Sequence, residues 1–291
     1  MKNRLPFLIL LILVFIIFSP WINLSKTLSS GDWPYLYKEN IQEFKIPTES
    51  PFLWLEPYHQ ITAKIGMELF SFPWEISERL FWFLPFIFIS VFSSYRFTKH
   101  YLSLVISGKN INLYLVLGVM IYIFNTYILM LVGGGQMGIV MAYSIAPLIF
   151  YKLDILIAEK FILRKLIMPT LALAIQLMFD PRLFILTIAA FLFYLIFKIS
   201  LDIKSFKNIK SIFFCIIFSI IFNSFWIFGN IGYYQNTYSL ILREPLAKFL
   251  SFATLANTIS LLHPNWPENI FGKIDFMRPE FLLIPIIVFP P

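Results

Sequence analysis

Few side chains in this sequence are of a type and in a place to do chemistry, and the first candidate is Asp32. It lies in the run Ser-Ser-Gly-Asp-Trp-Pro at 29–34, a few residues after a long apolar segment that opens the chain. A carboxylate close to a membrane surface can act as a general base toward a substrate that is anchored in lipid. The same run also predicts a turn in which Asp32 caps a helix that starts near Pro34. Both interpretations are open at this point.

The second candidate is the tripeptide Asp180-Pro181-Arg182, between two apolar segments. An arginine at such a turn can bind a phosphate group through charge-assisted hydrogen bonds. The alternative is a proline turn whose Asp180 and Arg182 anchor the neighbouring helices at the membrane interface.

The common motifs of soluble enzymes are missing from the sequence. There is no Walker A motif, no glycine fingerprint for a dinucleotide, no HExxH and no cysteine-histidine metal spacing. His59, His100 and His263 are far apart in the sequence, so a shared metal site would need a long-range coincidence. Cys215 lies in an apolar run, which favours a buried, inert thiol. The metal ligands, if there are any, are unknown from the sequence.

The composition decides which elements must position these residues. Apolar residues make up 59% of the chain and charged residues only 13%, and 34 residues are Phe, which leaves too little polar surface for a water-facing globule. The apolar runs are long and unbroken, and in a lipid bilayer such runs form helices, whereas a barrel needs short alternating strands. The sequence therefore predicts an all-α integral membrane protein in contact with the lipid bilayer.

Counting apolar runs predicts about seven to eight transmembrane helices in a single domain, 1–291. Seven runs approach or reach the roughly 20 residues that a span needs; they fall at 5–24, 80–95, 166–179, 183–197 and 211–230, with a helical hairpin of two in 110–151. The hairpin turns at three consecutive glycines, 133–135. An eighth run starts at Phe281 and reaches Pro291 after only 11 residues, so we expect a chain truncated at its C-terminus.

The charge distribution predicts the orientation. The chain carries a formal net charge of +7, and the excess of Lys and Arg falls on the loops that share the side of the N-terminus. Asp154 is counted there as a charge of an inner loop. The rule that cytoplasmic loops are basic then predicts a multi-pass plasma-membrane protein with its N-terminus in the cytoplasm. Because the basic excess is explained by topology, we expect no nucleic-acid partner.

Two long segments fall on the outer side, 25–79 and 231–280, so the chemistry is expected there. A first outer loop of this length exceeds the usual connection between elements and is typical of function. Within it, apolar residues at helical spacing predict an interfacial amphipathic helix; they are Ile61, Ile65, Leu69 and Phe72.

This pattern resembles the GT-C superfamily of polytopic membrane glycosyltransferases, whose first outer loop carries an acidic residue soon after helix one; Gly31-Asp32 is the matching element. The chain is also similar to the N-terminal membrane region of arabinofuranosyltransferase-like and YfhO-like proteins, at Gln136, Ala142-Tyr143, Pro147, Asp180-Pro181-Arg182, Asn223 with Trp226, and 251–266. The resemblance implies transfer of a sugar from a polyprenyl-phosphate donor to an extracytoplasmic glycan or lipid acceptor.

In that family role Asp32 is the general base or a metal ligand, so a divalent cation is a conceivable cofactor. Asp180, Arg182 and His263 are the implied substrate-binding residues. Many members carry a second acid directly after the first, whereas here Trp33 follows Asp32 and the next acids are Glu39 and Glu43.

Two other classes of function stay open. A lipid or polysaccharide transporter or flippase without transferase activity predicts polar residues along a path between helices, with Gln176, Asn223 and Asn230 as candidates. A membrane scaffold without catalysis predicts that neither Asp32 nor Arg182 borders a cavity.

Overall fold

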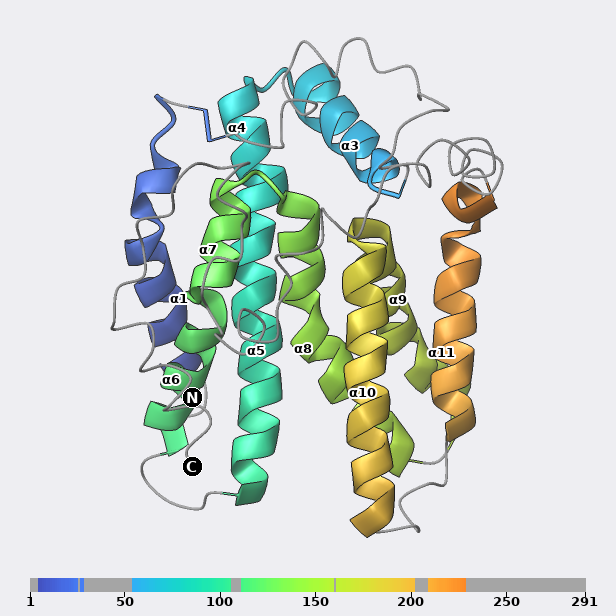
Figure 1. The fold of residues 1–291 in the computed structure, drawn as a ribbon. Coiled ribbons are helices and arrows are strands. Elements are labelled where there is room, and N and C mark those ends of the chain that lie inside the picture. The colour runs from blue at the N-terminus through green and yellow to red at the C-terminus, as the bar shows by residue number, and fades with distance from the viewer. Residues whose placement is uncertain are drawn as a thin grey trace, which may run out of the picture.

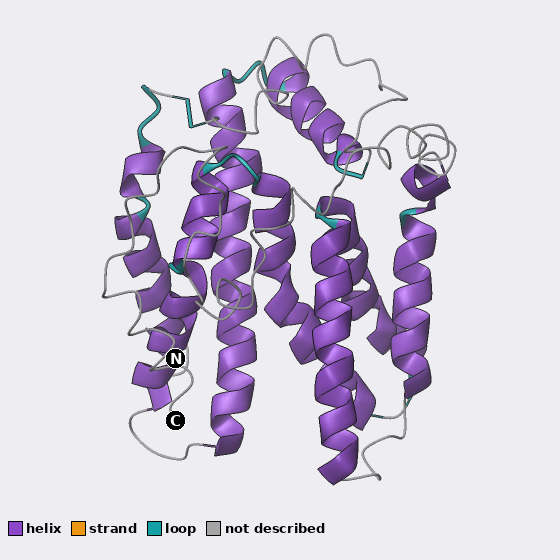
Figure 2. Cartoon of the chain, viewed as in Figure 1, coloured by secondary structure: helices purple, strands orange, loops and turns teal. Residues whose placement is uncertain are grey.

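The fold is a bundle of helices, with one pair of short helices lying across one end (Figures 1 and 2). The computed structural model describes residues 5–25, 27–28, 54–105, 111–159, 161–201 and 209–228. Every regular element in these ranges is helical. The predicted all-α class is therefore confirmed for the described part of the chain.

The helices follow the apolar runs of the sequence closely. In chain order they are α1 (Leu5–Ile17), η2 (Ser19–Ile22), α3 (Glu56–Ala63), η4 (Lys64–Leu69), α4 (Trp74–Glu78), η5 (Arg79–Phe83), α5 (Leu84–Val105), α6 (Ile111–Ile123), α7 (Thr126–Gly133), α8 (Met137–Ala158), α9 (Leu163–Phe179), α10 (Pro181–Leu201) and α11 (Ile209–Phe222). The wide π-type turns of η5 join α4 to α5, so that Trp74–Val105 is one continuous helix.

Three of the described helices are long and apolar enough to cross a membrane: Trp74–Val105, Met137–Ala158 and Pro181–Lys198. Shorter apolar helices are Pro6–Ile17, Ile111–Ile123 and Ile209–Phe222. Many large apolar side chains lie on the outside of the bundle, among them Phe193, Ile196 and Phe197 of α10. Such a surface is unfavourable in water and is covered by lipid tails in a membrane. Membrane association is thus supported, and the count of seven to eight spans stays a prediction.

The central helix of the bundle is α8. It packs against α5 on one side and against α9 and α10 on the other. In its most apolar stretch 61% of the residues are buried inside the protein, against 22% for α10, so α8 lies inside the bundle and α10 at its periphery. One apolar core joins α1, α5, α6 and α7 to the first half of α8, and a second joins its second half to α9, α10 and α11.

The predicted hairpin in 110–151 is present, and its turn has a clear cause. After α7, Gly135 adopts a φ of 75°, which favours glycine. Its N–H donates to the Val132 carbonyl at 3.1 Å, and the Gln136 N–H donates to the Leu131 carbonyl at 2.9 Å. This pair of bonds is the Schellman motif, which satisfies the free carbonyls at a helix end.

The first arm of the hairpin differs from the expectation of one helix, because it breaks between α6 and α7. Asn125 causes the break. Its Oδ1 accepts the N–H of Ile128 at 3.0 Å and so caps α7, while its Nδ2 donates to the Tyr122 carbonyl at 2.7 Å and to the Tyr143 hydroxyl at 3.1 Å. An asparagine side chain thus replaces the backbone bonds that a continuous helix would have.

A helix is also present where the amphipathic segment was predicted, as α3 followed by η4. Ile61, Ile65 and Leu69 are exposed, whereas His59 and Gly66 face the protein and are buried. A Cβ added at Gly66 would lie 2.8 Å from Ser77 Oγ, so only glycine lets η4 approach α4 this closely. The apolar stripe of this segment therefore points away from the bundle, as an interfacial helix requires.

Candidate functional site

Two of the four predicted site residues, Asp180 and Arg182, are described, and they lie at the turn between α9 and α10. This turn is at the end of the bundle that also carries α3 and α4, called the α3 end below (Figure 1). Asp32 and His263 lie outside the described residues.

Asp180 acts as the N-cap of α10. Its Oδ1 accepts the backbone N–H groups of Arg182 at 2.9 Å and Leu183 at 3.0 Å, and Pro181 occupies the first position of the helix, where no N–H is needed. The carboxyl is only 2% exposed. Asp180-Pro181-Arg182 therefore forms a proline-containing turn between two helices, as the second of the two interpretations predicted.

Arg182 is held by the same carboxylate and still reaches the surface. Its Nη2 lies 2.7 Å and its Nε 3.2 Å from Asp180 Oδ2. The side chain is 67% exposed, and its Nη1 makes no hydrogen bond to any residue that the structure describes. The guanidinium is thus oriented by one neighbour and keeps donors for an anion, so interface anchoring and phosphate binding are compatible roles.

An aromatic cluster joins α3 to this turn. The Tyr58 ring lies 4.9 Å from the ring of Trp82 and 4.9 Å from the ring of Phe179, the residue before Asp180. The Tyr58 hydroxyl donates to the Phe81 carbonyl. Helix α3, the π-type turns of η5 and the end of α9 therefore form one packed layer at the α3 end.

Two titratable side chains of this layer, Tyr58 and His59, are neutral near pH 7. Burial raises the pKa of Tyr58 to about 12 and lowers the pKa of His59 to about 3. The His59 ring lies 5.1 Å from the ring of Trp82. A histidine with so low a pKa is a poor base at pH 7, so His59 belongs to the packing of the α3 end.

A second polar pair at this end consists of Glu78 and Arg79. Predicted as the last residues of a loop, both lie inside the continuous helix Trp74–Val105, and Glu78 is fully buried. The helix therefore starts at Trp74, six residues before the expected Leu80. The helix can continue through this pair because each charge neutralises the other, with Arg79 Nη1 2.5 Å from Glu78 Oε1.

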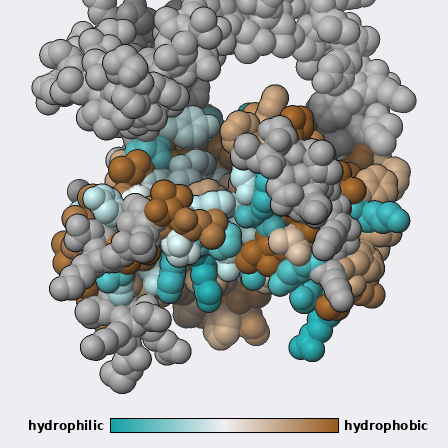
Figure 3. Space-filling model, turned by 90° about the horizontal axis from the view of Figure 1, so that it is seen from below, coloured by the Kyte–Doolittle hydropathy of each residue, from teal (hydrophilic) through white to brown (hydrophobic). Residues whose placement is uncertain are grey.

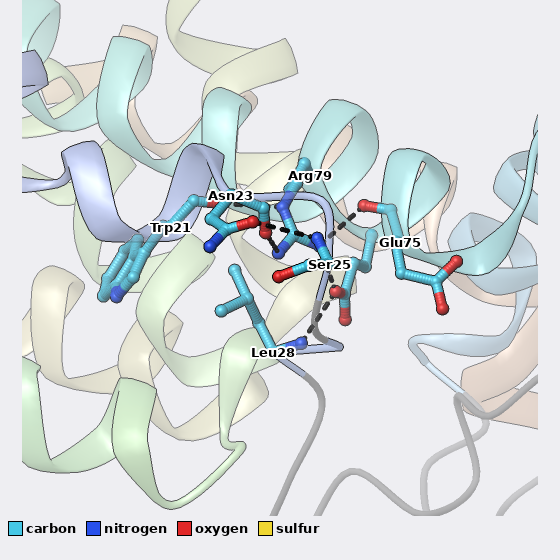
Figure 4. A network of polar contacts seen from close by, with 7 residues as sticks. Trp21, Asn23, Ser25, Leu28, Glu75 and Arg79 are labelled. Carbon is cyan, nitrogen blue, oxygen red and sulfur yellow. Dashed lines mark hydrogen bonds and ion pairs between the residues drawn. The ribbon is translucent and has the colours of Figure 1, made fainter.

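This pair connects the end of the first helix to α4 (Figure 4). Arg79 donates from Nε to the Trp21 carbonyl at 2.6 Å and from Nη2 to the Asn23 carbonyl at 2.6 Å, which satisfies carbonyls at and just after the end of η2. Glu78 Oε1 accepts the Leu28 N–H at 2.7 Å. We call Glu78 and Arg79 the loop clamp, because they hold the chain at the start of the segment that leads to Asp32.

Asp154, near the C-terminal end of α8, is another buried charged residue. It was expected in an inner loop, but it lies within the helix and is only 5% exposed. Its Oδ1 accepts from Tyr194 Oη at 2.9 Å and Lys198 Nζ at 2.5 Å, and its Oδ2 accepts from Tyr101 Oη at 3.0 Å. These donors from α5 and α10 compensate the buried charge. The apolar residues on either side of Asp154 were the signal that could have indicated its burial.

Asp154→Asn is expected to lower the free energy of unfolding by about 3 kcal/mol, because it breaks the ion pair with Lys198 between α8 and α10 and leaves Lys198 without its counter-charge. The midpoint of denaturant unfolding in detergent measures this loss. Glu159→Gln is the matched control. Its carboxylate pairs with Lys165 at 2.8 Å on the surface, both side chains about 40% exposed, so the change should stay below about 1 kcal/mol. Equal effects of the two substitutions would contradict a special role for Asp154.

Two of the three polar residues proposed for a transport path, Gln176 and Asn223, form hydrogen bonds between helices. Gln176 Nε2 donates to the Ala142 carbonyl at 3.0 Å, and Asn223 Nδ2 donates to the Ala174 carbonyl at 3.0 Å. Both side chains are buried. Asn230 lies outside the described residues. Interhelical bonding of this kind is common between membrane helices.

The described residues contain no group of three His, Cys, Asp or Glu side chains that could hold a metal ion. Comparison with known protein families, with curated proteins and with solved structures found no match to this chain. The function is therefore argued from the residues of the chain itself.

Proposed function

We propose that this protein is a membrane glycosyltransferase of the GT-C type, which transfers a sugar from a polyprenyl-phosphate donor to a glycan or lipid acceptor outside the cytoplasm. In this proposal α1, the helix Trp74–Val105, the hairpin arms and α9 to α11 cross the plasma membrane, with the N-terminus in the cytoplasm. The α3 end then faces outward, and the exposed apolar stripe of α3 and η4 lies in the membrane interface.

The observation that carries the proposal is the loop clamp. Glu78 and Arg79 bind the chain at Trp21, Asn23 and Leu28, the last of which lies four positions before Asp32. The turn between α9 and α10 lies at the same end of the bundle (Figure 1). The guanidinium of Arg182, next to this turn, is exposed. A segment that carries a carboxylate thus starts from a rigid point at the end that also offers a cation for phosphate.

In the proposed reaction, Asp32, Arg182 and His263 each have a separate role. The acceptor hydroxyl gives its proton to Asp32, and its oxygen forms a bond to the anomeric carbon of the donor sugar. The bond between that carbon and the phosphate oxygen breaks, and polyprenyl phosphate leaves with the electron pair. Arg182 stabilises the negative charge on the leaving phosphate through charge-assisted hydrogen bonds. His263 would contact the sugar or the acceptor.

Transfer from a set of radiolabelled polyprenyl-phosphate sugars by the purified full-length protein tests the proposal. A new glycosidic product from one donor supports it and identifies the donor. Movement of labelled lipid across the membrane of proteoliposomes without any such product would instead favour a transporter or flippase.

Arg182→Gln is expected to raise the KM for the donor about 10- to 100-fold, because a hydrogen bond to a charged group typically contributes about 1.5–3 kcal/mol. Initial rates over a range of donor concentrations measure the change. Lys64→Gln removes another exposed cation of the α3 end and should leave the KM within about twofold. An unchanged KM in Arg182→Gln would remove Arg182 from the donor site.

A further inference from the structure

A second polar region lies at the end of the bundle opposite to α3, where α1 begins and α5 ends. A cavity of about 680 Å³ opens there, a size within the usual range for ligand sites. It lies between α1, α5 and α8, and most of its wall comes from the last turns of α5. Figure 3, which looks onto this end of the molecule, shows hydrophilic side chains gathered among hydrophobic ones. None of the residues assigned to sugar transfer lines this cavity.

The cavity is positively charged. Arg96, Lys99 and His100 line it, and their spacing of three and four residues puts them on one face of α5. Among the residues that the structure describes, no carboxylate pairs with Arg96 or Lys99. Asp154 lies 3.5 Å from His100 Nε2, and Lys198 already neutralises its charge. Two cations therefore lack a counter-charge in the part of the cavity that is described.

Aromatic rings hold these cations in place. The Arg96 guanidinium lies 5.4 Å from the centre of the Phe92 ring, and Lys99 Nζ lies 5.6 Å from the centre of the Tyr95 ring. Both rings line the cavity, as does Tyr151, whose ring lies 5.0 Å from the His100 ring. The ring contacts restrict the motion of the two cationic side chains. Less side-chain entropy is therefore lost when these cations bind an anion.

We propose that this cavity binds the phosphate group of an anionic membrane lipid. Phosphate matches the charge-assisted donors of Arg96 and Lys99, and basic pockets between membrane helices are typical sites for anionic headgroups. A lipid is favoured over free phosphate because Phe7 of α1 also lines the cavity, and Leu8 and Ile12 of the same helix are exposed apolar side chains. Acyl chains can lie along this surface while the phosphate occupies the cavity. The inference does not depend on the proposed sugar transfer.

The test titrates the purified full chain in dodecyl maltoside with dioleoylphosphatidic acid and follows Tm and the apparent Kd. Binding to the native state raises Tm. The double variant Arg96→Gln/Lys99→Gln should weaken binding about 30-fold, because one basic group next to an anionic headgroup typically contributes about fivefold. Lys210→Gln, an exposed cation at the same end that does not line the cavity, should bind as the wild type does. Dioleoylphosphatidylcholine and sodium phosphate are the other two arms.

A Tm rise with phosphatidic acid that is lost in the double variant and kept in Lys210→Gln supports the proposal. A rise of the same size with sodium phosphate would overturn the lipid as the source and assign the cavity to free phosphate. Equal binding by the double variant, or none by the wild type, would overturn the site itself. Arg96 and Lys99 are exposed, so the double variant and the single variant Lys99→Gln should both fold. The single variant provides a second measurement, with an expected loss of affinity of about fivefold.

Discussion

Asp32→Asn is expected to lower the rate of sugar transfer by about 10²- to 10⁴-fold, the range that a general base contributes. Asparagine cannot take the proton of the acceptor hydroxyl, but it caps a helix about as well as aspartate does. The substitution therefore separates the two interpretations of Asp32, since a capping role alone predicts an active variant. Radiolabel transfer by purified protein at saturating donor gives the rate, and gel filtration checks that the variant is folded.

Glu39→Gln is the matched control, because it removes the next carboxylate along the same segment. It should keep its rate within about twofold. Full activity of Asp32→Asn would remove the general base from the proposal. Comparable losses in both variants would point to an effect of net charge on the segment rather than to a base at one position.

Arg79→Met is expected to lower the free energy of unfolding by about 3–5 kcal/mol, the typical cost of removing one partner from a buried ion pair. The substitution deletes the group that neutralises Glu78 and that binds the carbonyls of Trp21, Asn23 and Glu75. Because the loop clamp holds the start of the segment with Asp32, the variant should also lose transfer activity at temperatures where it is still folded.

The double variant Glu78→Gln/Arg79→Met tests the ionic part of this loss. It should recover part of the stability, since no buried carboxylate is then left without its arginine, but it should not recover transfer. Arg164→Met is the control, because Arg164 is an exposed arginine on α9; it should cost less than about 1 kcal/mol. If Arg79→Met is no less stable than Arg164→Met in denaturant unfolding, the loop clamp does not hold the fold together.

Much of the architecture follows from local patterns in the sequence. The apolar runs indicated helices, and α8, α10 and α11 lie where such runs were found. The glycines at 133–135 predicted the hairpin turn, because only glycine easily adopts the conformation of Gly135. The spacing of Ile61, Ile65, Leu69 and Phe72 predicted the short helix at the α3 end, which stops at Leu69, before Phe72. Each of these features depends on backbone conformation and side-chain period, which neighbouring residues determine.

Helix boundaries at charged residues were predicted less well. Glu78 and Asp154 were both expected in loops, since an isolated charge is costly in a membrane helix. Each is tolerated because a cation neutralises it, Arg79 in one case and Lys198 in the other. Lys198 lies 44 positions away from Asp154 in the chain, so no local pattern contains that pairing.

The sequence by itself determined the helical class, the membrane setting, the hairpin turn and the residues that could do chemistry, because these depend on composition and on local spacing. Only the tertiary structure decided that Asp180 caps a helix while Arg182 stays exposed, and that Glu78 and Arg79 hold the first loop. It alone brought Arg96 and Lys99 together with Phe7 around a cavity. These arrangements depend on how distant helices pack against one another, and packing joins residues that the sequence keeps apart.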